Sequence, residues 1–165
     1  MERGDTFMST FDVAQVCLNG HPANDSMRRL PQFNKNFCSK CGERTTRTCS
    51  SCNNPIPGQY HVEGVVSVGF RYHPPAYCQS CGSAFPWTTR GIQAAIEFAK
   101  LELDEADKEV FEQNVGELVK DSPQTKVAAA RIRKVFAKSG SAFGDSIREI
   151  LVDIASESAK KMLWG

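Results

Sequence analysis

The cysteines carry the clearest chemical pattern in the sequence. Six of the seven form three C-x2-C pairs, which are Cys38/Cys41, Cys49/Cys52 and Cys78/Cys81. The seventh, Cys17, is followed four residues later by His21. Two residues between paired cysteines let both thiolates face one ion, and a tetrahedral zinc site takes four ligands of these types. Seven thiols and one imidazole therefore predict two Zn²⁺ ions.

The order of the ligands allows two ways of dividing them between the ions. In a sequential arrangement, site 1 contains Cys17, His21, Cys38 and Cys41, and site 2 contains Cys49, Cys52, Cys78 and Cys81. In a cross-brace, as in RING-like domains, the pairs alternate between the ions. We expect the sequential arrangement, because each site then has the form of a zinc ribbon, two knuckles bridged by strands. The spacing gives less support to free buried thiols, an iron–sulfur cluster or redox C-x-x-C chemistry.

Both metals are expected to be structural. A catalytic zinc keeps one coordination position for water, whereas four protein ligands fill the tetrahedron. Such ions can replace the hydrophobic core that a small region of short strands cannot build.

The segments that must position these ligands have the character of short strands and turns. Residues 1–90 hold every cysteine and histidine and all but one of the prolines. Gly42 and Gly82 directly follow the second cysteine of a pair, where a knuckle needs the positive φ that glycine permits. A hairpin is expected after the second pair, in QYHVEGVVSVGFRY. Its apolar positions are Val62, Val66, Val68 and Phe70.

Residues 91–165 show helical periodicity almost throughout and predict four helices. Asp104 can cap the second helix, and Ser122 before a proline marks the start of the third, which ends near Gly140. The fourth has one apolar face from Ile147 to Met162. We therefore predict an α+β protein, with a double zinc-ribbon domain in residues 1–90 followed by a helical domain of about four helices in residues 91–165.

Composition excludes several classes of protein. The 165 residues include 20 Lys and Arg against 19 Asp and Glu, a balance that excludes a strongly basic nucleic-acid coat or an acidic tail. Hydrophobic residues make up 41%, which excludes bulk disorder. No apolar run approaches the roughly 20 residues of a membrane helix, and no secretory signal is visible. We expect a cytoplasmic protein with no membrane partner.

The stretches DVAQVCLNGH, FCSKCGERT, CSSC and YCQSCGSAFPWT resemble a family of small bacterial zinc-ribbon proteins classed only as a domain of unknown function. The resemblance covers residues 12–88 and includes all eight ligand positions. It implies a zinc-ribbon fold in a bacterial cytosolic protein, and it implies no activity.

No nucleotide-binding loop, nucleophile elbow or metalloprotease motif is present. His61 and Glu63 would share one face of a strand, which gives only weak support to a histidine-dependent nuclease. We expect His61 and His73 to be surface or packing residues. The leading hypothesis is a non-enzymatic adaptor that binds a protein or a nucleic acid. The alternative is an enzyme, either that nuclease or, with cross-braced metals, a ubiquitin-ligase-type module.

Two surfaces are candidates for partner contacts. Phe33 and Phe37 interleave with basic residues near the first ribbon, a composition typical of nucleic-acid-binding surfaces. The basic residues concerned are Arg28, Arg29, Lys35, Arg44 and Arg47. Seven zinc-bound thiolates offset this charge, because they bring the net charge of residues 1–90 from +3 to about 0.

The second surface is the apolar face of the fourth predicted helix, which continues to the last residues. Large apolar side chains at a chain end indicate that something covers them. This predicts an interface, formed with a partner or with a second copy of the chain in a homo-oligomer. The residues expected to form it are Ile147, Ile154, Met162 and Trp164.

Overall fold

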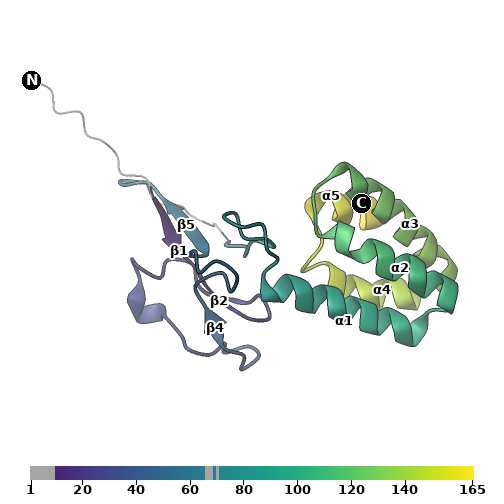
Figure 1. Ribbon diagram of the computed structural model, residues 1–165, viewed down its shortest axis with the longest axis horizontal. Coiled ribbons are helices and arrows are strands. Elements are labelled where there is room, and N and C mark those ends of the chain that lie inside the picture. The colour runs from purple at the N-terminus through teal and green to yellow at the C-terminus, as the bar shows by residue number, and fades with distance from the viewer. Residues whose placement is uncertain (1–9, 66–68, 70) are drawn as a thin grey trace, which may run out of the picture. The chain divides into compact units, whose positions relative to one another are not determined.

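The computed structural model describes residues 10–65, 69 and 71–165. The chain forms two compact units, Met1–Trp87 and Thr88–Gly165, called here the N-terminal unit and the helical unit. The N-terminal unit contains short antiparallel strands and the two cysteine clusters, and the C-terminal part contains helices (Figure 1). This confirms the predicted α+β fold class.

The strands of the N-terminal unit form two small antiparallel sheets. In the first, β1 (Thr10–Val13) pairs with β5 (Pro57–His61), as Figure 1 shows. The second has the order β3-β2-β4, in which β2 (Gln15–Cys17) lies between β3 (Pro22–Asn24) and β4 (Thr45–Thr46). A short 3-10 helix, η1 (Pro31–Phe33), follows β3. Cys17 is the last residue of the central strand β2, and the turn that leads to β3 begins directly after it.

The first part of the hairpin predicted after the second cysteine pair lies in β5. The strand that contains Tyr60 and His61 pairs with β1, about 50 residues earlier in the chain. Three of the apolar positions expected in the hairpin, Val66, Val68 and Phe70, lie outside the described residues.

The core of the N-terminal unit is small. Val16, Ile56 and Phe85 are its large fully buried side chains, and the Phe85 ring stacks on Trp87 with the ring centroids 4.6 Å apart. Trp87 also donates a hydrogen bond from Nε1 to the carbonyl of Pro75, at 2.9 Å. Cys49 and Cys78 belong to the same cluster, so the metal-type residues are part of this core.

Five helices follow, one more than predicted. They are α1 (Pro86–Glu102), α2 (Glu105–Leu118), α3 (Pro123–Ser139), α4 (Ser141–Leu151) and α5 (Glu157–Trp164). The expected caps are present: the Asp104 side chain accepts a hydrogen bond from the Asp107 N–H, and Ser122 forms a capping box with Thr125. Within the described ranges, no helix combines the length and apolar composition that a bilayer span requires.

The prediction of one continuous fourth helix was wrong. The chain leaves the helix after Leu151, and α5 begins again after Ser156, whose hydroxyl accepts a hydrogen bond from the Ala159 N–H. The apolar spacing continues through the break because Ile154 and Ala155 also pack toward the core. The Ser156 N–H donates to the carbonyl of Leu118, which anchors the turn to the end of α2.

The predicted interface residues lie in or against the core of the helical unit. Ile147 is fully buried and is not available to a partner. Ile154, Met162 and Trp164 are partly buried and pack against the same core, and the Arg148 guanidinium lies over the Trp164 ring. These apolar side chains are therefore covered, at least in part, within a single chain.

Candidate metal centres

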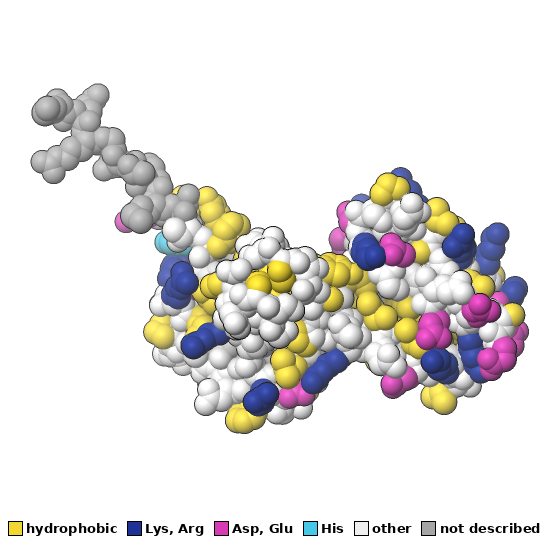
Figure 2. Space-filling model, viewed as in Figure 1, with side chains coloured by type: hydrophobic (Ala, Val, Ile, Leu, Met, Phe, Trp, Pro, Cys, Tyr) yellow, Lys and Arg dark blue, Asp and Glu magenta, His cyan; other side chains and the backbone are white. Residues whose placement is uncertain are grey.

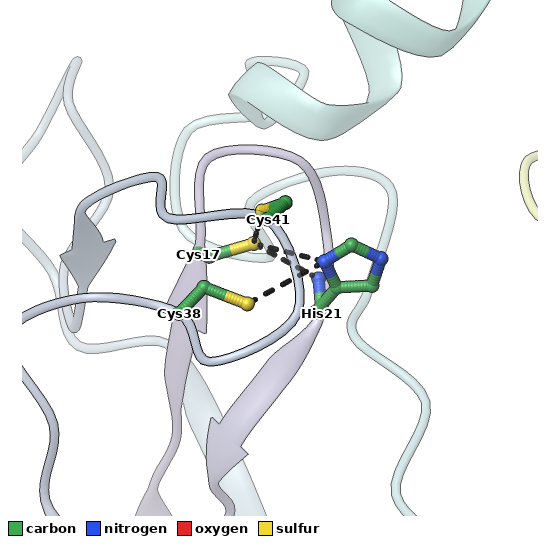
Figure 3. Close-up of side chains that lie close together, drawn as sticks. All are labelled: Cys17, His21, Cys38 and Cys41. Carbon is green, nitrogen blue, oxygen red and sulfur yellow. Dashed lines mark hydrogen bonds between the residues drawn. The ribbon is translucent and has the colours of Figure 1, made fainter.

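The first four-residue group comes from two turns of the N-terminal unit. Cys17 ends β2 and His21 precedes β3, so the β2–β3 turn supplies both. The next C-x2-C turn supplies Cys38 and Cys41, and all four side chains point toward one another (Figure 3). The His21 Nδ1 atom lies 3.5 Å from the sulfurs of Cys17 and Cys38. The Cys17 and Cys41 sulfurs are 3.8 Å apart.

The second group is made only of cysteines. The sulfurs of Cys49 and Cys81 are 3.7 Å apart, as are those of Cys52 and Cys78. In each group, the four donor atoms lie within 4.8 Å of one another. The grouping follows the sequential arrangement and not the cross-brace.

These distances match those of a tetrahedral ion. With metal–sulfur bonds of about 2.3 Å and a metal–nitrogen bond of about 2.0 Å, sulfur–sulfur edges are about 3.8 Å and sulfur–nitrogen edges about 3.5 Å. A disulfide would need a sulfur–sulfur distance of about 2.0 Å, and all seven cysteines are free thiols. The two groups are thus compatible with two metal sites, each with four protein donors.

The three C-x2-C turns share one backbone design. In each, the N–H of the first cysteine bonds to the carbonyl five residues on, at 2.8–2.9 Å, and one residue pair forms a β-bridge around the turn. Gly42 and Gly82 adopt φ of +70° and +74°, which confirms the role expected for them. In the remaining turn, Asn53 takes this position with φ of 59°. Asparagine is among the non-glycine residues that tolerate this region best.

Hydrogen-bond donors surround the sulfurs. The N–H groups of His21, Lys40 and Ser51 lie 3.3–3.4 Å from the sulfurs of Cys17, Cys38 and Cys49 respectively. Two asparagine side chains add further donors, Asn19 to Cys41 and Asn54 to Cys52. Such donors stabilise thiolates and orient them toward a cation. The asparagines were not identified from the sequence, where only their position next to the cysteines could have indicated them.

The pKa values of Cys41, Cys81 and Cys17 are shifted from the usual value for a thiol. A backbone hydrogen bond from Glu43 lowers the pKa of Cys41 to about 6, and hydrogen bonds from Ser83 lower that of Cys81 to about 6. Burial raises the pKa of Cys17 to about 11. A bound divalent cation favours the thiolate at each of these three positions, so metal binding would release a proton from Cys17 in particular.

The other predicted site residues lie elsewhere in the N-terminal unit. All five basic residues, Arg28, Arg29, Lys35, Arg44 and Arg47, are exposed, as are Phe33 and Phe37. Exposed Phe11 and Tyr60, which the sequence did not single out, pack together across β1 and β5. His61 is half-buried on β5, and His73 is exposed. Neither histidine belongs to a metal group.

Comparison with known proteins places the whole described fold in one family. No curated protein and no solved structure matches the chain. One family model extends from the start of β1 into the last turn of α5. The chain belongs to the family described as an uncharacterized protein conserved in bacteria (DUF2321), whose model matches residues 10–163.

Proposed function

We propose that the N-terminal unit is a double zinc ribbon with two structural Zn²⁺ ions. The observation that carries this proposal is the agreement between the donor distances of both groups and the edges of a zinc tetrahedron. Borderline-soft zinc takes thiolate and imidazole ligands of this kind. The small core of the unit supports a structural role, because metal ligation supplies stability that its few buried side chains do not.

On this basis, the protein acts as a non-enzymatic adaptor of the cytoplasm that binds a protein or nucleic-acid partner. Four protein donors per ion leave no position for a substrate or a catalytic water. The ubiquitin-ligase-type alternative depended on a cross-brace, and the sequential grouping of the donors gives it no support.

The nuclease alternative also gains no support from the surroundings of His61. This residue lines a cavity of about 420 Å³ with Arg29 and Tyr60. The described lining of the cavity contains no carboxylate that could pair with the imidazole or hold a metal. A histidine acting as general base in a nuclease site would need such a partner close by.

The helical unit is the proposed assembly element. Deleting residues 163–165 removes buried Leu163 and half-buried Trp164. A fall in sedimentation coefficient would support homo-oligomer formation through α5. A lower melting temperature with an unchanged sedimentation coefficient would show that these residues serve only the core and would exclude this route to assembly.

Metal counting by native mass spectrometry tests the central proposal. We expect two zinc ions per chain in the wild type and one in either His21→Ala or Cys49→Ser. In His21→Ala the remaining ion should be protected by the four cysteines of the second group. His73→Ala is the matched control, since this exposed histidine lies in neither group, and it should keep both ions. A folded wild-type chain with one ion or none contradicts the proposal.

A further inference from the structure

The exposed aromatic side chains of the described chain all lie in the N-terminal unit. Phe11, Phe33, Phe37 and Tyr60 are 59%, 54%, 60% and 48% exposed. The large apolar residues exposed on the helical unit are aliphatic: Leu101, Val127 and Val152. Exposing four rings forfeits the stabilisation that their burial would bring, so their position on one unit indicates a surface that contacts a partner.

The described Lys and Arg side chains of this unit lie on its surface. Between residues 10 and 87 there are seven Lys and Arg, all exposed, against four Asp and Glu. Because the zinc-bound thiolates would cancel this excess, the unit offers exposed cations rather than a net positive charge. In the described part of the unit, none of these cations lies within ion-pair distance of a carboxylate. The helical unit differs, because five of its lysines form ion pairs. On the face in Figure 2, dark blue side chains of the N-terminal unit lie among yellow ones with little magenta, whereas blue and magenta alternate on the helical unit.

The rings and cations occur in neighbouring pairs. Phe37 and Arg44 face each other across a β-bridge beside the first metal group, which places their side chains next to one another. Tyr60 lines a cavity with Arg29, and its ring lies 4.9 Å from that of Phe11 between centroids. Each pair thus offers a flat surface next to a positive charge.

Arg28 belongs to a second pair of cations, and its backbone is held by a buried carboxylate. Arg28 and Arg47 line one small cavity. The Asp12 carboxylate accepts hydrogen bonds from the backbone N–H groups of Arg28 and Arg29, at 2.9 and 3.2 Å. Because Asp12 binds the backbone, both guanidinium groups remain available to an external anion.

We propose that these exposed rings and arginines of the N-terminal unit bind single-stranded nucleic acid. The arginines contact phosphates, and unpaired bases stack on Phe37 and on the Phe11–Tyr60 pair. This rests on the proposed binding role of the zinc ribbons and names the class of partner. Stacking on exposed rings requires unpaired bases, which excludes duplex as the preferred form.

Fluorescence anisotropy with labelled oligo-dT and oligo-U tests the inference, with a duplex of equal length and unlabelled heparin as competitors. Replacing a stacking ring in Phe37→Ala or Tyr60→Ala should weaken binding about 5- to 140-fold, which corresponds to the loss of one base–aromatic stack. Arg44→Gln should lower the slope of log affinity against log salt by about 0.7, as expected for one lost phosphate contact on a single strand.

Lys126→Gln and Arg133→Gln provide matched controls. Both side chains are exposed on α3 without a carboxylate partner in the described chain, so each variant loses the same charge from the other unit. Their affinity should equal that of the wild type. Weaker binding in the controls and unchanged binding in Phe37→Ala and Tyr60→Ala would overturn the inference, as would equal binding of single strand, duplex and heparin.

Metal content measured on the same samples separates the two proposals. Phe37 precedes a ligand, so its variant must be compared at two zinc ions per chain, and Tyr60→Ala provides a second ring variant away from the ligands. If the chain holds two zinc ions but binds no oligonucleotide, the nucleic-acid inference is refuted. The proposed partner of the ribbons is then a protein. A natively folded chain without zinc refutes the proposed function itself.

Discussion

Metal removal should unfold the N-terminal unit and leave the helical unit folded. A structural zinc site contributes on the order of 10 kcal/mol or more to folding. A whole domain is usually stable by only about 5–15 kcal/mol. Because the unit has two such sites and few large buried side chains, the metal-free form should be unfolded at 25 °C. Of the residues that the structure describes, all α-helical ones except Pro86 and Trp87 lie in the helical unit, so the far-UV helical signal should change little.

The two tryptophans allow each unit to be followed separately. Trp87 is 8% exposed in the core of the N-terminal unit, and Trp164 lies in the helical unit. In a Trp164→Phe chain, a strong chelator should move the remaining emission to longer wavelength as Trp87 becomes exposed. In the matched Trp87→Phe chain, the emission of Trp164 should not move. Added zinc should reverse the first change.

Two results would refute this reasoning. If Trp87 emission and its thermal transition are unchanged in chain shown to be free of metal, the core alone suffices and the metals are not structural. If Trp164 responds to the chelator as strongly as Trp87, the two units do not unfold independently.

Three further predictions concern individual residues. Gly58→Ala should destabilise the N-terminal unit by about 3 kcal/mol or more in urea titrations at saturating zinc, because a Cβ there would lie 2.2 Å from the carbonyl oxygen of Asp25; a loss below 1 kcal/mol, in order of magnitude, would contradict the observed close approach. Asp12→Ala should cost about 2–4 kcal/mol in the same assay, because it leaves the buried Val13 N–H without its acceptor and frees the backbone of both arginines; an unchanged urea midpoint would exclude this role. The hydrogen bond to Asp107 raises the pKa of Lys138. The stability that this bond contributes is therefore complete below the pKa of Lys138 in the unfolded chain and is lost as pH rises through its pKa in the folded chain. The melting temperature followed at 222 nm should therefore fall less above about pH 10.4 in Lys138→Gln than in the wild type, and parallel curves would contradict this assignment.

The sequence was sufficient to predict features that depend on local chemistry. Cysteine and histidine are distinctive ligands, and C-x2-C spacing brings two thiols together within one turn, so both groups could be proposed without knowing the fold. The start of α2 at Asp104 and that of α3 at Ser122 follow from side chains that bond to backbone within the same turn.

Features that depend on distant pairing were not predicted. The register of β1 with β5 brings Phe11 next to Tyr60, and no local pattern encodes that contact. The break between α4 and α5 was missed because Ile154 and Ala155 keep the apolar period while leaving the helix. Ser156 followed by Glu157 was the available signal, an N-cap residue before an acidic first turn.

The sequential grouping of the donors has a consequence for synthesis of the chain. No member of the second group lies between members of the first, so the first group is complete once Cys41 has left the ribosome. The second group needs about 40 further residues, which take roughly 2–8 s at 5–20 residues per second. One ion can therefore be captured before the second set of thiols is complete. During synthesis the first ribbon can therefore form before the second, and the thiols of the first group do not remain unligated until the second group has been synthesised.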